Sequence, residues 1–243
     1  MLDPNYANST VKLKVATELY VASTQTELET AISNGIETIQ VIDDDSTVTL
    51  NEVNLKDVTL INSNISISNS VLNNVIIHNS SYKDKGNNTL TDAILDETTI
   101  TSDTTNYSTY TDCIVNECTV TSTELHITGT IDNTTLTNSL IISDGVILIT
   151  DNTFTGKGSK DYFPSHLYLT GEFTVKNNTF TLNDTWSNLA YNMCIIKTLT
   201  TFNVNEFITN NTFNLNITYS TEPTNTLYYN IVDDDKIKAV RLN

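Results

Sequence analysis

A short motif repeats along the C-terminal half of this sequence of 243 residues. Residues 151–154, 177–180 and 210–213 each contain Asn or Asp, then Asn, Thr and Phe, and each copy follows residues typical of a strand. A looser copy spans residues 114–120. The copies that begin at residues 114, 148, 174 and 207 are separated by 34, 26 and 33 residues. A fixed core at unequal steps predicts a repeated structural unit that carries loops of different length.

The motif itself predicts a parallel coil. An apolar pair ends one strand, and two Asn or Asp residues then make a sharp bend, one of them in the left-handed conformation that Asn tolerates. Thr points outward and Phe points inward at the start of the next strand. Stacked units therefore place Phe over Phe and Asn over Asn. Successive strands lie about 4.8 Å apart, and the Asn side chains can bond to one another along the stack.

The N-terminal half predicts short strands preceded by a helix. Between residues 36 and 77, apolar residues recur in short runs that Asn or Ser separates, with no Asn-Gly or Asp-Gly hairpin signal. This pattern favours a solenoid over a meander. Before it, Thr24 and Glu27 form a capping box, Leu28 begins a helical spacing, and Gly35 is the expected stop. These signals predict a helix of about two to three turns.

Composition agrees with a coil that turns without glycine. Only 7 Gly and 3 Pro occur, so Asn must supply many left-handed corners. Hydrophobic residues make up 38% and are mostly types that fit a pleated, half-buried surface, so we expect order rather than disorder. We expect residues 1–22 to be an N-terminal strand segment or the end of a preceding domain. Residues 23–226 would form the β-helix and residues 227–243 a C-terminal hairpin or cap.

Charge excludes several kinds of partner. The net charge is −17 and Arg241 is the only Arg, so we expect no nucleic acid, no anionic membrane and no Arg fork for an anion. No segment resembles a membrane span or a signal peptide, and the composition favours a fragment of a larger secreted protein over an intracellular one. Cys113 and Cys118 could form a disulfide across a turn. We instead expect all three cysteines, Cys194 included, to be buried as small hydrophobic residues.

The order of helix and strands over residues 24–42 resembles the start of many right-handed parallel β-helices of the pectin-lyase-like kind, in which a short helix caps the first coil. The Asn-Asn-Thr-Phe units, with their Asn, Ile and Thr bias, resemble adhesin-like surface proteins of methanogenic archaea over roughly residues 20–225. The resemblance implies an all-β, right-handed parallel β-helix displayed outside the cell. It also implies non-covalent attachment to glycans or to surface proteins of other cells. The general preference for right-handed crossovers agrees.

Two alternatives stay open, a polysaccharide-active lyase or hydrolase on the same scaffold and a structural envelope spacer. The enzymes need converging carboxylates with basic or His neighbours, which the sequence spacing does not provide around His78, His126 or His166. Two acidic runs could bind calcium or supply a carboxylate pair, but their spacing matches no calcium loop and we interpret them as solvated turns. These runs are Asp43, Asp44 and Asp45, and Asp233, Asp234 and Asp235. We therefore assign no catalytic residue, metal or cofactor.

Aromatic residues in the inserted loops are the candidate contacts. Insertions follow each Phe of the motif, so they should leave the same corner of the coil and gather on one side. They contain Tyr162, Phe163, Trp186 and Tyr191, beside Asn, Asp and Ser. Such residues can bind a glycan by ring stacking and hydrogen bonds. The alternative is that they pack their own loops onto the coil.

Overall fold

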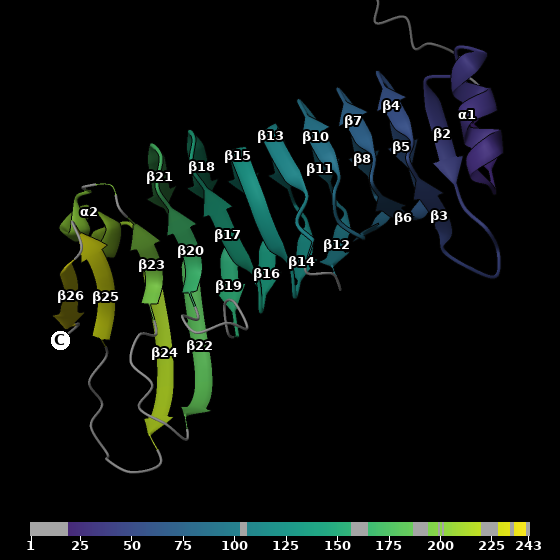
Figure 1. Ribbon diagram of the computed structural model, residues 1–243. Coiled ribbons are helices and arrows are strands. Elements are labelled where there is room, and N and C mark those ends of the chain that lie inside the picture. Colours follow the sequence, from purple (N-terminus) through teal and green to yellow (C-terminus); the bar gives the residue numbers. More distant parts are fainter. Residues whose placement is uncertain are drawn as a thin grey trace, which may run out of the picture.

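The computed structural model describes residues 19–102, 106–156, 165–186, 194–198, 200, 202–219, 228–233 and 236–241. The neighbouring strands of its two large sheets are all parallel, and the chain winds through them as a β-solenoid, as the repeat predicted. The turns stack from α1 (Gln25–Ser33) at one end to α2 (Val204–Thr209) at the other (Figure 1). Of the expected N-terminal segment 1–22, residues 1–18 lie outside the described residues, and Tyr20–Ala22 form strand β1.

Three outward faces run along the stack. Strands β13 (Thr109–Asn116) and β15 (Glu124–Asp132) continue around one corner, so the first and third faces belong to a single 15-stranded sheet. The first face has β1 Tyr20–Ala22, β2 Thr38–Val41, β5 Thr59–Ile61, β8 Ile76–His78, β11 Ile94–Asp96, the ends of β13 and β15, β18 Ile147–Thr150 and β21 Phe173–Lys176. The third has β4 Asn54–Lys56, β7 Val71–Asn73, β10 Thr89–Thr91, the starts of β13 and β15, β17 Leu140–Ser143, β20 Ser165–Leu169 and β23 Cys194–Thr198.

The second face is a separate nine-stranded sheet. Its strands are β3 Val48–Asn51, β6 Asn64–Ser68, β9 Ser81–Asp84, β12 Thr99–Ser102, β14 Thr119–Thr121, β16 Thr135–Thr137, β19 Thr153–Thr155, β22 Thr179–Trp186 and β24 Thr212–Tyr219. Most of its strands have only three to five residues, because a corner follows almost at once. Buried Ile, Val, Leu and aromatic side chains from all three faces meet in one core cluster.

The turns are shorter than the motif steps suggested. Equivalent inward-facing corner residues are 17 positions apart at Ser63 and 26 apart at Asn152. The step of 34 residues from Ile114 to Leu148 spans two turns, because Thr130 pairs with both. The longer turns thus belong only to the C-terminal part of the coil.

Left-handed residues make the corners. Within the described residues, 16 non-glycine residues have positive φ, and half of them are Asn, as the scarcity of Gly predicted. The others are Asp, which the motif also placed at the bend, and Glu and Ser, which the sequence interpretation did not expect. The Asn positions are Asn62, Asn69, Asn74, Asn79, Asn87, Asn133, Asn138 and Asn177; the others are Glu52, Asp57, Asp92, Glu97, Asp112, Glu117, Ser122 and Asp151.

A polar ladder lies inside the coil, next to these corners. The residue after the corner points inward, and its side-chain oxygen accepts the backbone N–H of the equivalent residue one turn earlier. The ladder residues on one corner are Ser63, Ser80, Thr98, Cys118, Thr134, Asn152, Asn178 and Asn211. The expected bond between stacked Asn side chains is confirmed, because Nδ2 of Asn152 donates to Oδ1 of Asn178 at 3.0 Å.

The predicted Phe stack is also confirmed. The rings of Phe154 and Phe180 are 4.7 Å apart and nearly parallel at 14°. The rings of Phe180 and Phe213 are 5.4 Å apart at 10°. The third motif copy differs in one respect, because the residues before it form the helix α2 rather than a strand.

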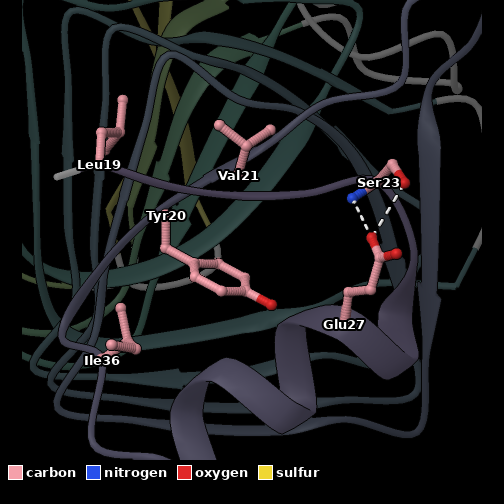
Figure 2. Close-up of a pocket in the computed structure, with 6 residues that line it drawn as sticks. All are labelled: Leu19, Tyr20, Val21, Ser23, Glu27 and Ile36. Atoms are coloured by element: carbon pink, nitrogen blue, oxygen red, sulfur yellow. Dashed lines mark hydrogen bonds between the residues drawn. The ribbon is translucent and has the colours of Figure 1, made fainter.

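The capping helix begins and ends as predicted. Thr24 accepts the backbone N–H of Glu27, and Gly35 has the left-handed φ of 77° that ends the helix. Glu27 reaches one residue further back than a capping box requires, since its carboxylate accepts both the N–H and the hydroxyl of Ser23 (Figure 2). Ile36 closes the C-terminus by donating to the carbonyl of Ala31.

The last described strands, β25 (Tyr228–Asp233) and β26 (Lys236–Arg241), pair in antiparallel fashion. They lie beside the final turn of the coil, near β23 (Figure 1).

Candidate functional site

The second face carries a regular array of threonines. On β12, β14, β16, β19 and β22, the sequence Thr-x-Thr places one buried residue between two outward-facing Thr side chains. The strands pair in register, so the threonines form two straight rows along the solenoid. We call these ten residues the threonine array: Thr99, Thr119, Thr135, Thr153 and Thr179 in one row, and Thr101, Thr121, Thr137, Thr155 and Thr181 in the other.

The array is ordered and uncharged. Thr99, Thr119 and Thr135 are exposed, and the others are partly buried. The hydroxyls of Thr137 and Thr155 lie 2.9 Å apart and hydrogen-bond across the strands. Strands β12, β14, β16, β19 and β22 lie side by side along one side of the stack (Figure 1). In a chain with a net charge of −17, five aligned Thr-x-Thr segments whose outward side chains carry no charge form a distinctive surface.

A column of exposed hydrogen-bond acceptors borders the array. The left-handed corner residue stands two positions before the first row in each turn, and all five of these residues are exposed. We call them the corner column: Glu97, Glu117, Asn133, Asp151 and Asn177. Carboxylate and amide oxygens therefore lie along one edge of the threonine rows.

One group of side chains on this edge has metal-ligating geometry. One ligand atom from each of His78, Asp96 and Glu97 lies within 4.8 Å of the other two. Nδ1 of His78 is 2.9 Å from Oδ2 of Asp96, and the other carboxylate oxygen of Asp96 accepts Nδ2 of Asn116 at 2.7 Å. Both Asp96 oxygens thus already have protein partners. We therefore interpret His78 and Asp96 as a hydrogen-bonded pair across neighbouring strands rather than as metal ligands. The structure places His78 at the end of β8, at a turn, as the sequence suggested.

Asp43, Asp44 and Asp45 do not belong to that group. Asp43 binds its own turn, since its carboxylate accepts the hydroxyl of Ser46 at 2.7 Å. Asp44 and Asp45 are exposed beside it, which matches a solvated turn. Of the second run, Asp233 ends β25, and Asp234 and Asp235 lie outside the described residues.

The aromatic loop contacts remain predictions. Tyr162, Phe163 and Tyr191 lie outside the described residues. Trp186 is the last residue of β22, where its backbone pairs with Tyr219 of β24.

His166 is a buried residue, and its burial was not predicted from the sequence. It lies on β20 with 1% of its surface exposed, and its ring is 5.5 Å from that of Phe154. Neither ring nitrogen makes a hydrogen bond to another described residue. Burial lowers the pKa of His166 to about 4, against a smaller opposing contribution from the backbone of Ser139. A neutral imidazole packed against rings is a core residue, and no hydrogen bond or ion pair joins it to a carboxylate of the described residues, as a catalytic histidine would need.

Asp84 is the buried carboxylate of the core. Its Oδ1 accepts Asn88, Ser108 and the backbone of Gly86, and its Oδ2 accepts the Tyr110 hydroxyl at 2.6 Å. Burial raises the pKa of Tyr110 well above its ordinary value. Four donors offset the buried negative charge and fix the bend after β9. The alternation of β9, with Tyr82 also inward, could have revealed this position.

Cys113 and Cys118, the two cysteines whose side chains the structure describes, are free and buried, as expected. Cys118 occupies a position in the polar ladder, and its thiol donates to the carbonyl of Leu95 at 3.2 Å. Burial raises the pKa of Cys113 to about 11 and that of Cys118 to about 12. Both are therefore thiols without nucleophilic character at neutral pH.

A hollow lies at the first turn, where Figure 2 shows Leu19, Tyr20, Val21, Ser23, Glu27 and Ile36. The Glu27 carboxylate there is engaged by Ser23, so the hollow belongs to the capping arrangement.

A scan against protein-family models matched no family, and a search of curated proteins found no relative. No helix among the described residues has both the length and the apolar character needed to cross a bilayer.

Proposed function

We propose that this chain is a non-catalytic binding and display module of a cell-surface protein, which attaches without covalent chemistry to glycans or to partner cells. The observation that carries the proposal is the continuous stack of parallel turns, whose outward faces keep exposed side chains along the described part of the chain. Each turn contacts only its neighbours along the axis, and such repeat architectures present extended outer surfaces for binding.

The chemistry of the surface supports the same proposal. One face is a regular hydroxyl surface with acceptors along its edge. The resemblance of the Asn-Asn-Thr-Phe units to adhesin-like surface proteins points in the same direction, and it implies an extracellular location. The aromatic residues Tyr162, Phe163, Trp186 and Tyr191 are proposed as additional contacts.

A glycan-array screen of the folded chain tests this function, with Trp186→Ala as the contact variant and Tyr107→Ala as the matched control. Tyr107 is an exposed aromatic residue, with 47% of its surface accessible, before the start of β13. Selective glycan binding that Trp186→Ala loses and Tyr107→Ala keeps is the expected result. A chain that binds no glycan and no cell surface would leave a structural spacer as the better description.

A further inference from the structure

We propose that the threonine array is the contact surface for an extended, uncharged polysaccharide, whose chain lies along the solenoid axis across successive strands. This inference rests on the proposed function and adds the ligand class and the face that binds it.

The spacing of the array suits a ligand with a repeat. Neighbouring strands are about 4.8 Å apart and the two rows about 6.7 Å apart. The five strands, four steps in all, therefore present hydroxyls over roughly 19 Å. A linear polysaccharide presents the same hydroxyl groups once in every repeat, so each added sugar meets another pair of threonines. Affinity should then rise with chain length until the ligand covers the array.

The chemistry of threonine also suits a sugar chain. Its hydroxyl both donates and accepts hydrogen bonds, and its methyl group packs against the apolar C–H face of a ring. Because a β-branched side chain has few χ1 rotamers and the strands are held in a sheet, little side-chain entropy is lost on binding. The Thr137–Thr155 hydrogen bond shows that these two hydroxyls are already ordered within the sheet.

Charge selects a neutral polymer. The array has no charged residue, so contact with it desolvates only hydroxyls, which costs far less than desolvating ions. Beside it, the exposed carboxylates of Glu97, Glu117 and Asp151 can accept hydrogen bonds from sugar hydroxyls. The same carboxylates and the net charge of −17 repel an anionic polysaccharide such as polygalacturonate.

The test measures binding of the full chain to neutral glucan and chitin oligosaccharides of increasing length, to the insoluble polymers, and to polygalacturonate. The disrupting variant is Thr119→Lys with Thr135→Lys, two exposed neighbours in one row. The matched control is Thr89→Lys with Thr109→Lys, an exposed neighbouring pair on the third face. A third variant, Thr119→Val with Thr135→Val, keeps the shape and strand propensity but removes two hydroxyls. Far-ultraviolet circular dichroism and urea midpoints check that each variant folds.

The expected result is length-dependent binding to a neutral polymer, weakened at least tenfold in the lysine array variant and unchanged in the third-face control. The valine variant should show a smaller loss, and it carries the test if the lysine variant does not fold. Unchanged binding in both array variants would place the contact elsewhere and overturn this inference while the proposed function stands. Absence of binding to every polysaccharide tested overturns this inference, and the proposed function falls with it only if the chain also binds no glycan on the array and no cell surface. Ice-crystal shaping or dimerisation, lost in the array variants in place of polysaccharide binding, would assign the array to ice or to a second copy.

Discussion

Asn152 offers the sharpest test of what holds the coil together. It is 1% exposed, its Oδ1 accepts the backbone N–H of Thr134 at 2.8 Å, and its Nδ2 donates to the carbonyl of Ile131 at 2.9 Å. Asn152→Ala leaves that N–H and that carbonyl in a dry interior. Each buried polar group left without a hydrogen bond costs about 1–3 kcal/mol. The cost for the carbonyl lies at the low end of this range, so the expected loss in unfolding free energy is about 2–4 kcal/mol.

A second substitution separates the ladder from simple packing. Asn152→Thr keeps an acceptor for Thr134, as other threonines do in the same column, so its loss should be only about 1–2 kcal/mol. The exposed corner residue Asn133, changed to Ala, is the control, and it should cost about 1–2 kcal/mol through its left-handed φ alone.

The assay combines urea unfolding with amide hydrogen exchange at single residues. Because a solenoid is stabilised turn by turn, the Thr134 amide should lose protection in Asn152→Ala while the distant Ser63 amide keeps it. Unchanged protection at Thr134, together with a loss in unfolding free energy below about 0.5 kcal/mol, would refute the ladder as a source of stability.

Three further predictions follow from buried polar groups. Because the pKa of His166 is about 4 in the folded chain against an ordinary 6.5, the unfolded chain takes up a proton first as pH falls. Stability should therefore drop by about 3 kcal/mol between pH 6.5 and 4 in urea titrations, and His166→Phe should lack this part of the dependence. With the pKa of Cys113 raised to about 11 and that of Cys118 to about 12, a thiol reagent at mildly alkaline pH should react only after unfolding; rapid labelling of the native chain would contradict their burial. Cys118→Ser supplies a better acceptor in the ladder and should raise unfolding free energy by about 0.5–1 kcal/mol, whereas a lower urea midpoint would contradict this assignment.

The fold could be predicted from the sequence where the same residue type occupies the same structural position in successive turns. The Asn and Phe stacks of the last turns were predicted because Asn152 and Asn178, and Phe154 and Phe180, repeat the same letters. Earlier turns use Ser or Thr inside the ladder and Ile or Val in place of Phe, so their shorter period stayed hidden. Hydrogen-bonding capacity and inward direction are conserved along the coil, while residue identity is not.

The Thr-x-Thr segments of the threonine array are visible in the sequence, but the sequence analysis did not predict that they form one surface. The motif analysis placed one Thr outward in each unit, yet only the register of β14 with β16 shows that outward residues of successive strands align. The Asp84 network could not be predicted in full, because its partners Ser108 and Tyr110 come from the next turn, more than 20 residues away.

The internal ladder also gives the coil a direction. In the rungs formed by Ser, Thr and Asn, the accepting oxygen belongs to the later turn and the donating N–H to the earlier one, as in the bonds from Ser63 to Ser80 and from Asn178 to Asn211. A turn is therefore finished only when its successor has arrived. On a ribosome, where the N-terminus emerges first, α1 closes the starting end and every new turn completes the one before it. Truncation within the coil leaves the ladder N–H of the last turn without its acceptor. Insertion or deletion of whole turns keeps every N–H paired with the following turn, so the length of the coil is expected to change by whole turns.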